Sequence, residues 1–469
     1  MDAFKIDEQG CVTMQEQPTL KREIRLFGGM AILTGIMVGS GIFFIGSNVL
    51  ARTAFMSAGL AVLIWLIGGL ITLLYGLIYA ELGTLYPLSG GYYVYLRKAY
   101  GKPVAFMSGF MNFTLASSAS IAVLALAFAQ ILANIVASLT ESPLMGRLPM
   151  VLIAMTMIVL LSFLNVLGIR LGTTLMKGFM IVKAVPIIGI IFLGLAMGTQ
   201  AVDWSLNLEG IGFFRLMSMI GFAVIATFFA YEGWTNLNNV AEEIDNPGRN
   251  LPRALILTMA LVTGVYVLYN VSIFRVLSLG DIEAMVTSGN VFIGIPAAMA
   301  LLGTAGMYLV MVTMLISVFG ALNGCIMTFP RVYYAMAKDN VFITSFTRLH
   351  PRYQTPYLAI IGSGLMGIVL LVFSLDELIS LIAFGAMIFN ILIFATVFIF
   401  RHQDKDAPRP YKVWGYPVLP GLAIVITALL VVAIFVEGRR EALIGALFIL
   451  SGLPIYYLLE VLNKRRLTR

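Results

Sequence analysis

Long apolar runs dominate this 469-residue chain and recur from Leu26 to Leu462. Runs of about 18 residues or more can cross the hydrocarbon core of a bilayer as a helix. They do not alternate apolar and polar residues, as the strands of a membrane barrel would, so the expected spans are helices. Only 11% of the residues are charged, against about 25% in soluble domains. These features predict an all-α integral membrane protein embedded in the lipid bilayer.

Length and flanking charge divide the apolar runs into about twelve spans. Several of them exceed the length that a crossing needs, which predicts tilted or broken helices. The expected limits are 26–50, 56–84, 104–136, 149–167, 174–197, 210–238, 252–277, 296–336, 357–374, 377–400, 418–436 and 442–462.

Lysine and arginine set the expected orientation of the spans. Of the 30 basic residues, 23 fall on the side that holds both termini, six fall on the opposite side, and Lys183 lies within a span. By the positive-inside rule both termini are expected in the cytoplasm, in a multi-pass protein of the plasma (inner) membrane. The same asymmetry accounts for the net charge of +7, so no nucleic-acid partner is implied.

Cysteine and histidine give no sign of a metal site, a cofactor or a disulfide framework. Cys11 lies in the polar N-terminal segment and Cys325 lies in a span, two settings that are too different for pairing. His350 and His402 fall in loops on the cytoplasmic side, so no histidine-based catalytic centre is expected in the membrane. No apolar segment precedes Leu26, so the first residues are expected to be a cytoplasmic tail rather than a signal peptide.

Two spans carry glycines that a continuous helix would not need. The first reads MVGSGIFFIG over 37–46, and the sixth reads FFAYEGW over 228–234, with Glu232 beside Gly233 at membrane depth. Each glycine costs a helix about 1 kcal/mol relative to alanine. Interrupted spans at corresponding positions of two halves point to a transporter site built on broken helices. Small residues that let membrane helices pack closely are the alternative explanation.

A helix that unwinds inside a membrane leaves backbone groups that a ligand must satisfy. The half-helix that begins near Ser40 directs its N-terminus at a carboxylate, and carbonyls near Met37 and Val38 and from Phe229 to Tyr231 accept from an ammonium group. An α-amino acid carries both groups. The candidate binding residues are Met37, Val38, Gly39, Ser40, Gly41, Ile42, Phe229, Ala230, Tyr231, Glu232, Gly233 and Asn236.

Five stretches carry a resemblance to a known family. GSGIF (39–43) resembles the first-helix signature of the amino acid–polyamine–organocation (APC) superfamily. The others resemble its L-type amino acid transporter (LAT)-like branch, in the order of that branch. They are AELGTLYPLSGGYYVYLRKAYG (80–101), FFAYEGWTNLNNVAEEIDNPGRNLPRA (228–254), SVFGALNGCIMTFPRVYYAMAKDN (317–340) and RPYKVWGYPVLP (409–420).

The resemblance implies a LeuT-like fold of 5+5 inverted repeats with discontinuous helices 1 and 6. It also implies amino acid transport, commonly by exchange, with Phe229 as an aromatic lid over the substrate. The expected organisation is a tail over 1–25, a ten-helix core over 26–400 with repeats 26–197 and 210–400, a cytoplasmic loop over 401–417, helices 11 and 12 over 418–462, and a tail over 463–469.

Two further residues match family positions with roles in coupling or gating. Lys183 would replace a sodium ion, with its ammonium group on carbonyls near Gly35 or Ile36; snorkelling to the interface is the alternative. This reading argues against sodium coupling, and it leaves proton coupling through Lys183 open. Tyr266 would hold the first half of the broken helix, or it simply packs with one hydrogen bond.

Substrate range and partners follow from departures from the family pattern. Glu232 replaces a small residue of most L-type members, and either pairs with a cationic side chain of dibasic substrates or binds the backbone of its own loop. Animal L-type exchangers join a heavy chain through a cysteine in the second external loop. The corresponding loop here, 137–148, has no cysteine, so no disulfide-linked heavy chain is expected.

Charges near the cytoplasmic side form a hypothetical inner gate, although solvated helix ends explain them equally well. They are Glu81, Arg97, Arg170, Glu242 and Glu243.

The sequence therefore predicts a secondary amino acid transporter, sodium-independent, that exchanges L-amino acids by alternating access. The substrates would be neutral, with dibasic ones as an open extension. A proton-coupled symporter is the first alternative. A membrane enzyme and a channel are remote, because no nucleophile–base pair and no repeated pore-lining pattern is visible.

Overall fold

The computed structural model describes residues 4–6, 12–14, 20–39, 41–140, 145–206, 212–288, 292–373, 375–437 and 439–467. Within these ranges the chain is almost entirely helical, and the expected all-α class is confirmed. The α-helices are α1 Leu26–Met37, α2 Gly41–Arg52, α3 Ala58–Leu85, α4 Tyr92–Tyr100, α5 Lys102–Met111, α6 Ser117–Thr140, α7 Arg147–Val166, α8 Ile169–Met197, α9 Phe213–Tyr231, α10 Asn236–Asn239, α11 Pro247–Val276, α12 Leu279–Thr287, α13 Gly294–Thr328, α14 Pro330–Lys338, α15 Tyr357–Leu370, α16 Leu375–Gln403, α17 Val418–Glu437 and α18 Arg439–Leu467.

Short elements complete the described chain. A π-helical turn, η1 (Asn112–Ala116), joins α5 to α6 without interrupting the span, and 3₁₀ turns lie at η2 (Ala241–Glu243) and η3 (Thr344–Thr347). Strands β1 (Phe4–Ile6) and β2 (Val12–Met14) pair antiparallel. These strands lie in the segment expected to be only a polar tail.

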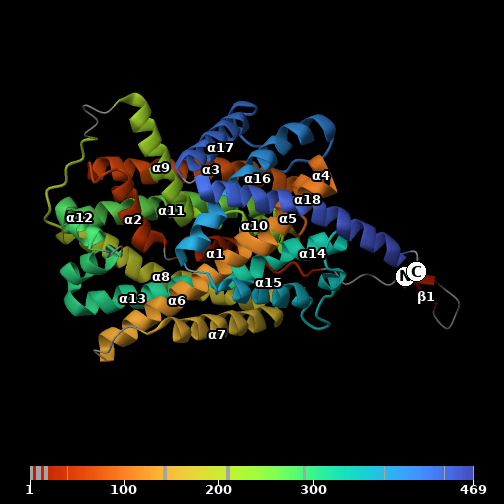
Figure 1. Cartoon of the computed structure of the whole chain (residues 1–469), viewed down its shortest axis with the longest axis horizontal. Helices are drawn as coiled ribbons and strands as arrows, with labels where there is room; N and C mark the ends of the chain where they lie inside the picture. Colours follow the sequence, from red (N-terminus) through yellow and green to blue (C-terminus); the bar gives the residue numbers. More distant parts are fainter. Residues whose placement is uncertain are drawn as a thin grey trace.

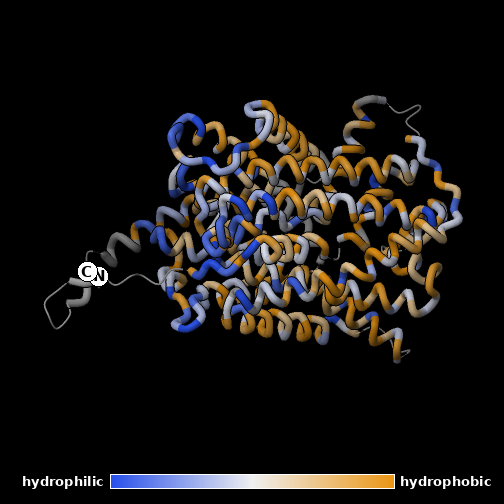
Figure 2. The backbone as a smooth tube through the Cα atoms, turned by 180° about the vertical axis from the view of Figure 1, so that it is seen from behind, coloured by the Kyte–Doolittle hydropathy of each residue, from blue (hydrophilic) through white to orange (hydrophobic). Residues whose placement is uncertain are grey.

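Seven of the described helices, some of them joined end to end, are long and apolar enough to cross a membrane, and five shorter apolar helices accompany them. The helices lie side by side along the long axis of the molecule, with β1 and the last turns of α18 at one end (Figure 1). We call this the terminal end. Hydrophilic segments gather there, whereas the long helices are largely hydrophobic along their length (Figure 2). This distribution is the one expected of a multi-pass membrane protein.

Glycines on α3 bring it against α11. A side chain at Gly69 would collide with Thr263, and one at Gly76 would collide with Met259. Small residues of this kind let backbones approach where the bilayer supplies no hydrophobic driving force between helices. The close pair α3–α11 forms one wall of the core in which the broken helices lie.

The chain breaks inside the core at the two places that the glycines indicated. Helix α1 ends at Met37 and α2 starts at Gly41 on the other side of the gap. Helix α9 ends at Tyr231, four residues of turn follow, and α10 starts at Asn236. The expectation of two interrupted helices is therefore met by the observed helix bounds.

Candidate functional site

The two breaks lie against each other. A Cβ atom at Gly41 would lie 2.8 Å from the Cα atom of Ala230. Gly233 has φ +114°, and a Cβ atom there would lie 2.5 Å from the side chain of Ile36. Only glycine combines that left-handed backbone with so close an approach. The local sequence GSG and EGW therefore allows the ends of four half-helices to meet at one point.

Helix ends at this point offer both kinds of backbone group. Since α2 begins at Gly41, its first N–H groups have no acceptor within the helix, and they carry the positive end of the helix dipole. The last carbonyls of α1 and α9 lack intrahelical donors for the same reason. Some of those carbonyls have side-chain partners, which are described next.

Lys183 on α8 is 1% exposed and reaches the end of α1. Its Nζ atom donates to the carbonyl oxygens of Thr34 at 3.0 Å, Gly35 at 3.2 Å and Val38 at 2.6 Å. The three donors of an ammonium group match three acceptors. The lysine therefore points inward to the break. The predicted acceptor Gly35 is among the three, whereas Ile36 is not.

Ser317 on α13 binds the same break, although nothing in the sequence ranks it above other polar residues in membrane helices. Its hydroxyl donates to the carbonyl oxygen of Val38, and the carbonyl oxygen of Gly39 lies 3.4 Å away. Val38 thus uses both lone pairs of its carbonyl oxygen, one on Lys183 and one on Ser317.

Tyr266 on α11 links the two breaks. Its hydroxyl oxygen lies 2.7 Å from the carbonyl oxygen of Met37 and 2.9 Å from that of Ala230. The ring is fully buried and packs edge-on against Trp65 at 5.2 Å between ring centroids. One residue therefore fixes the last turn of α1 relative to the last turn of α9.

Glu232 differs from its neighbours in exposure. Its side chain is exposed, whereas Tyr231 and Trp234 on either side of the turn are 0% and 3% exposed. The backbone N–H of Gly233 lies within hydrogen-bonding reach of the carboxylate, and Tyr79 is close enough for an electrostatic interaction. The Glu232 side chain therefore keeps accessible surface at the break, whereas Tyr231 and Trp234 beside it do not.

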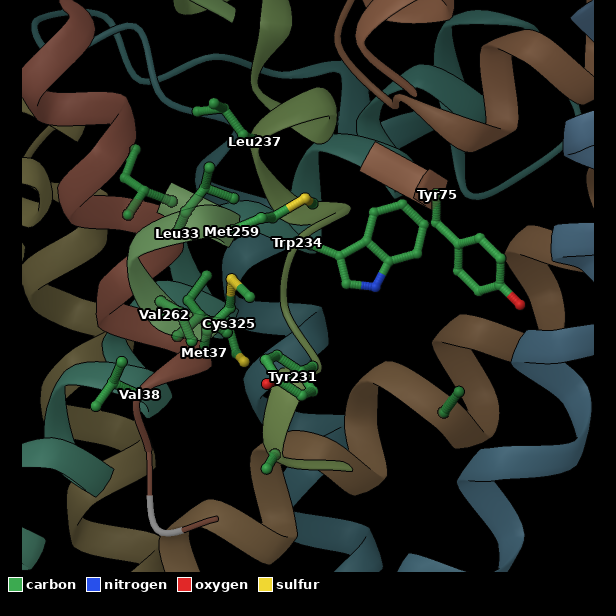
Figure 3. Packing of buried hydrophobic residues seen from close by; sticks show 14 of the residues in the cluster. Leu33, Met37, Val38, Tyr75, Tyr231, Trp234, Leu237, Met259, Val262 and Cys325 are labelled. Atoms are coloured by element: carbon green, nitrogen blue, oxygen red, sulfur yellow. The ribbon is translucent and has the colours of Figure 1, made fainter. Parts of the chain in front are cut away.

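Aromatic rings surround this turn. Trp234 packs edge-on against Tyr79 at 4.7 Å and lies 5.8 Å from Tyr75, as measured between ring centroids. Figure 3 shows Trp234 and Tyr75 on one side of the turn, with Met37 and Val38 of the first break on the other. Asn390 on α16 accepts from the Tyr79 hydroxyl at 3.1 Å. The turn after α9 thus combines the Glu232 carboxylate with nearby aromatic rings and polar groups.

The remaining predicted site residues fall into two groups. Asn236 is 2% exposed, donates to the Gly233 carbonyl oxygen at 3.1 Å and accepts from Thr328 at 2.8 Å, so its amide supports the turn. Ser40 lies outside the described residues, as does the side chain of Phe229. In the ranges that the structure describes, no group of three or more His, Cys, Asp and Glu side chains is placed to hold a metal ion.

Three ion pairs lie at the terminal end. Glu243 accepts from Arg331 at 2.8 Å and Glu81 from Arg401 at 2.7 Å, while Arg97 pairs with Asp339 at 2.7 Å. The inner gate predicted from the sequence includes Glu243, Glu81 and Arg97. It does not include their partners Arg331, Arg401 and Asp339. Of its other members, Glu242 accepts from the backbone N–H of Ser89, and Arg170 forms no ion pair with any described residue.

Glu243 also ties down the chain that precedes α1. Its backbone carbonyl oxygen accepts from the N–H groups of Glu23 and Ile24 at 3.0 Å, and the N–H of Asp245 donates to the Ile24 carbonyl oxygen at 2.9 Å. Burial raises the pKa of the Glu243 carboxyl, and the Arg331 guanidinium opposes that rise. The segments before α1 and after α10 are therefore joined at the terminal end.

Two broken helices that meet in the core of a multi-pass helical bundle are the features of a secondary transporter. The comparison with protein families makes the class specific: the model of the family described as amino acid permease matches residues 24–459. The chain belongs to that family, and it is an amino acid transporter. The resemblance read from the five motifs is confirmed.

Three relatives cover almost the whole chain. The serine/threonine exchanger SteT of Bacillus subtilis (strain 168) is 33% identical over 445 residues, which span 94% of this chain and 98% of the relative. The human b(0,+)-type amino acid transporter 1 is 30% identical over 96% of this chain and 91% of its own. The rabbit (Oryctolagus cuniculus) large neutral amino acids transporter small subunit 2 is 29% identical over 94% and 80%. This chain is similar to exchangers and transporters throughout its length.

Proposed function

We propose that the protein is a sodium-independent amino acid exchanger that works by alternating access between two inverted repeats of a twelve-span, LeuT-like fold. The observation that carries the proposal is Lys183, whose ammonium group lies on three carbonyls at the end of α1. A fixed cation occupies the place where a sodium-coupled transporter of this architecture would need a mobile one. The likeness to exchangers supports exchange rather than one-way uptake.

The substrate would bind at the two breaks. Its carboxylate would meet the free N–H groups at the start of α2 and Ser40, and its ammonium group would meet carbonyls of Met37, Ala230 and Glu232. Phe229 would cover it, and Tyr266 would keep the two breaks together. The membrane would be the plasma (inner) membrane, with both termini in the cytoplasm, since basic residues gather at the terminal end. No disulfide-linked heavy chain would be needed, because 137–148 lacks cysteine.

The side-chain preference would be set beside Glu232. Small neutral amino acids, including serine and threonine, are the first candidates, because the relative in Bacillus subtilis is a serine/threonine exchanger. The exposed Glu232 carboxylate, flanked by rings of Trp234 and Tyr79, would extend the range to dibasic substrates. A cation between a carboxylate and aromatic rings gains both charge-assisted and cation–π stabilisation.

Exchange is tested in proteoliposomes that are loaded with each amino acid in turn. Uptake of labelled serine and labelled arginine is followed with and without sodium, with empty vesicles as the control. We expect uptake only into loaded vesicles and at the same rate in both media. Uptake into empty vesicles that grows with an inward proton gradient would instead identify a proton symporter, and a requirement for sodium would contradict the role given to Lys183.

Replacing Glu232 by glutamine is expected to change the substrate range rather than to stop transport. Loss of the charge should lower competition by arginine and lysine at least about tenfold, because a desolvated charged hydrogen bond is worth about 1.5–3 kcal/mol. Competition by serine should change by less than about threefold. Inhibition constants against labelled serine measure both. Glu283→Gln, at an exposed site on α12, is the matched control. Equal losses for both substrate classes would show that Glu232 serves only its own loop.

A further inference from the structure

The loop that joins α16 to α17, residues 404–417, is held firmly at its inner edge. Within the loop, the backbone N–H of Val413 donates a hydrogen bond to the Glu81 carboxylate at 2.7 Å. Arg401, near the end of α16, donates two more to the same carboxylate, at 2.9 and 2.7 Å. Glu81 and Val413 are buried, at 1% and 4% exposure. The loop is therefore a fixed part of the terminal end.

The outer edge of the same loop exposes large apolar and aromatic groups. Trp414 is 65% exposed, Tyr416 38% and Val418 70%. These residues lie at the start of α17 and just before it. The Arg401 guanidinium packs over the Tyr416 ring, 4.0 Å from the ring centroid. Tryptophan and tyrosine at the ends of membrane helices occupy the headgroup level of a bilayer. The loop therefore meets the membrane surface with this edge.

Three cations accompany these rings. Lys412 is exposed within the loop, and Arg249 and Arg253 are exposed one turn apart on α11. The loop reaches the start of α11, because a Cβ atom at Gly248 would lie 3.0 Å from Pro410. Arg249 and Arg253 are four positions apart, so they lie on the same face of α11. None of the three cations forms an ion pair with a residue that the structure describes.

Acidic residues near the three cations are few. Asp404 accepts the Tyr86 hydroxyl, and Asp406 and Asp245 are exposed at the edges. We define the basic–aromatic patch as Arg249, Arg253, Lys412, Trp414 and Tyr416. We propose that this patch binds the headgroups of anionic phospholipids in the leaflet at the terminal end. A phosphate would meet the three cations while the rings lie at the headgroup level. The inference concerns the membrane surface and is independent of the transported substrate.

Each cation near an anionic surface is worth about 1 kcal/mol, or about fivefold in lipid enrichment. The patch should therefore prefer anionic over zwitterionic lipid strongly at low salt, and less at high salt. The chain offers a built-in reporter, because it has four tryptophans. Trp65 and Trp234 are buried, at 0% and 3% exposure, whereas Trp204 at 47% belongs to the segment after α8.

The test is quenching of tryptophan fluorescence in the full-length Trp204→Phe variant, in which Trp414 is the exposed tryptophan. Vesicles of phosphatidylcholine and phosphatidylglycerol carry bromine on one lipid or on the other at equal amounts. We expect stronger quenching by brominated phosphatidylglycerol. The triple change of Arg249, Arg253 and Lys412 to glutamine should abolish that preference while quenching by both lipids persists. The Trp414→Phe variant, which reports on Trp204, is the control and should show no preference.

Three results would overturn the proposal. Equal quenching of Trp414 by the two brominated lipids would mean that the patch touches lipid without selecting charge. No quenching by either lipid would place Trp414 in water or under another partner. A preference that survives the triple change, or that ignores salt, would mean that the three cations do not carry it. Serine exchange by the triple variant, measured in parallel, reports whether the protein remains folded.

Discussion

Exchange is expected to fall below about one tenth of the native rate when Lys183 is replaced by alanine. The ammonium group binds the carbonyl oxygens of Thr34, Gly35 and Val38 at the end of α1. Each bond to a charged group is worth about 1.5–3 kcal/mol, and loss of even one such contribution corresponds to a tenfold effect. Without the lysine, the carbonyl oxygens of Thr34, Gly35 and Val38 each lose a donor at a buried site. The measurement is the initial rate of serine exchange in proteoliposomes.

The matched control is Lys177→Ala, on the same helix but half-buried. It removes the same side chain without touching the break, and it should keep the native rate within about twofold. Substrate-induced thermal stabilisation in detergent separates a folded but inactive Lys183→Ala protein from an unfolded one. A native exchange rate in folded Lys183→Ala protein, or uptake that requires sodium, would contradict the coupling role of the lysine.

The features that the sequence predicts best are those that violate the rules of a membrane helix. Glycines in MVGSGIF and EGW, a carboxylate at Glu232 and a cation at Lys183 each cost stability in an apolar span. Such a cost needs a compensating contact, and the structure supplies one at Lys183 and at both breaks. The broken helices, the helical class and the inward direction of Lys183 therefore follow from residue type and position.

The details that the sequence does not predict depend on where the backbone unwinds. Val38 accepts from Lys183 in place of the expected Ile36, because its carbonyl is freed one residue beyond the end of α1. Ser317 looks like any serine in a membrane helix until Val38 is known to face it. Asn236 is a candidate binding residue from the sequence, and the structure adds that its amide donates to Gly233 and accepts from Thr328 at the start of the short α10.

The sequence does not predict which residues form the ion pairs, and the reason is different. Glu243 and Arg331 are 88 positions apart, and their pairing depends on how α14 packs against the turn after α10. Charge patterns near helix ends indicate only that ion pairs are possible there. The sequence therefore leaves ion pairs and solvated helix ends equally open, and the packing of the helices decides which charges pair.

Arg331→Met is expected to destabilise the protein by about 3–5 kcal/mol, because it leaves the Glu243 carboxylate buried without its cation. The two side chains are 0% and 2% exposed, and the Arg331 Nε atom lies 2.8 Å from Glu243 Oε1. Glu243 also carries the backbone bonds to Glu23 and Ile24, so the loss should loosen the chain that enters α1. The measurement is the midpoint of thermal unfolding in detergent, together with the rate of proteolysis before α1.

The double variant Arg331→Met/Glu243→Gln separates a broken pair from lost packing. Removal of both charges should restore most of the midpoint, since a buried pair can be replaced by neutral groups at little cost. Arg97→Met is the matched control: its partner is Asp339 at 2.7 Å, but Arg97 is 39% exposed, and exposed pairs contribute at most about 1 kcal/mol. Equal losses for Arg331→Met and Arg97→Met, or no recovery in the double variant, would contradict the large stability loss assigned to the unpaired Glu243 carboxylate.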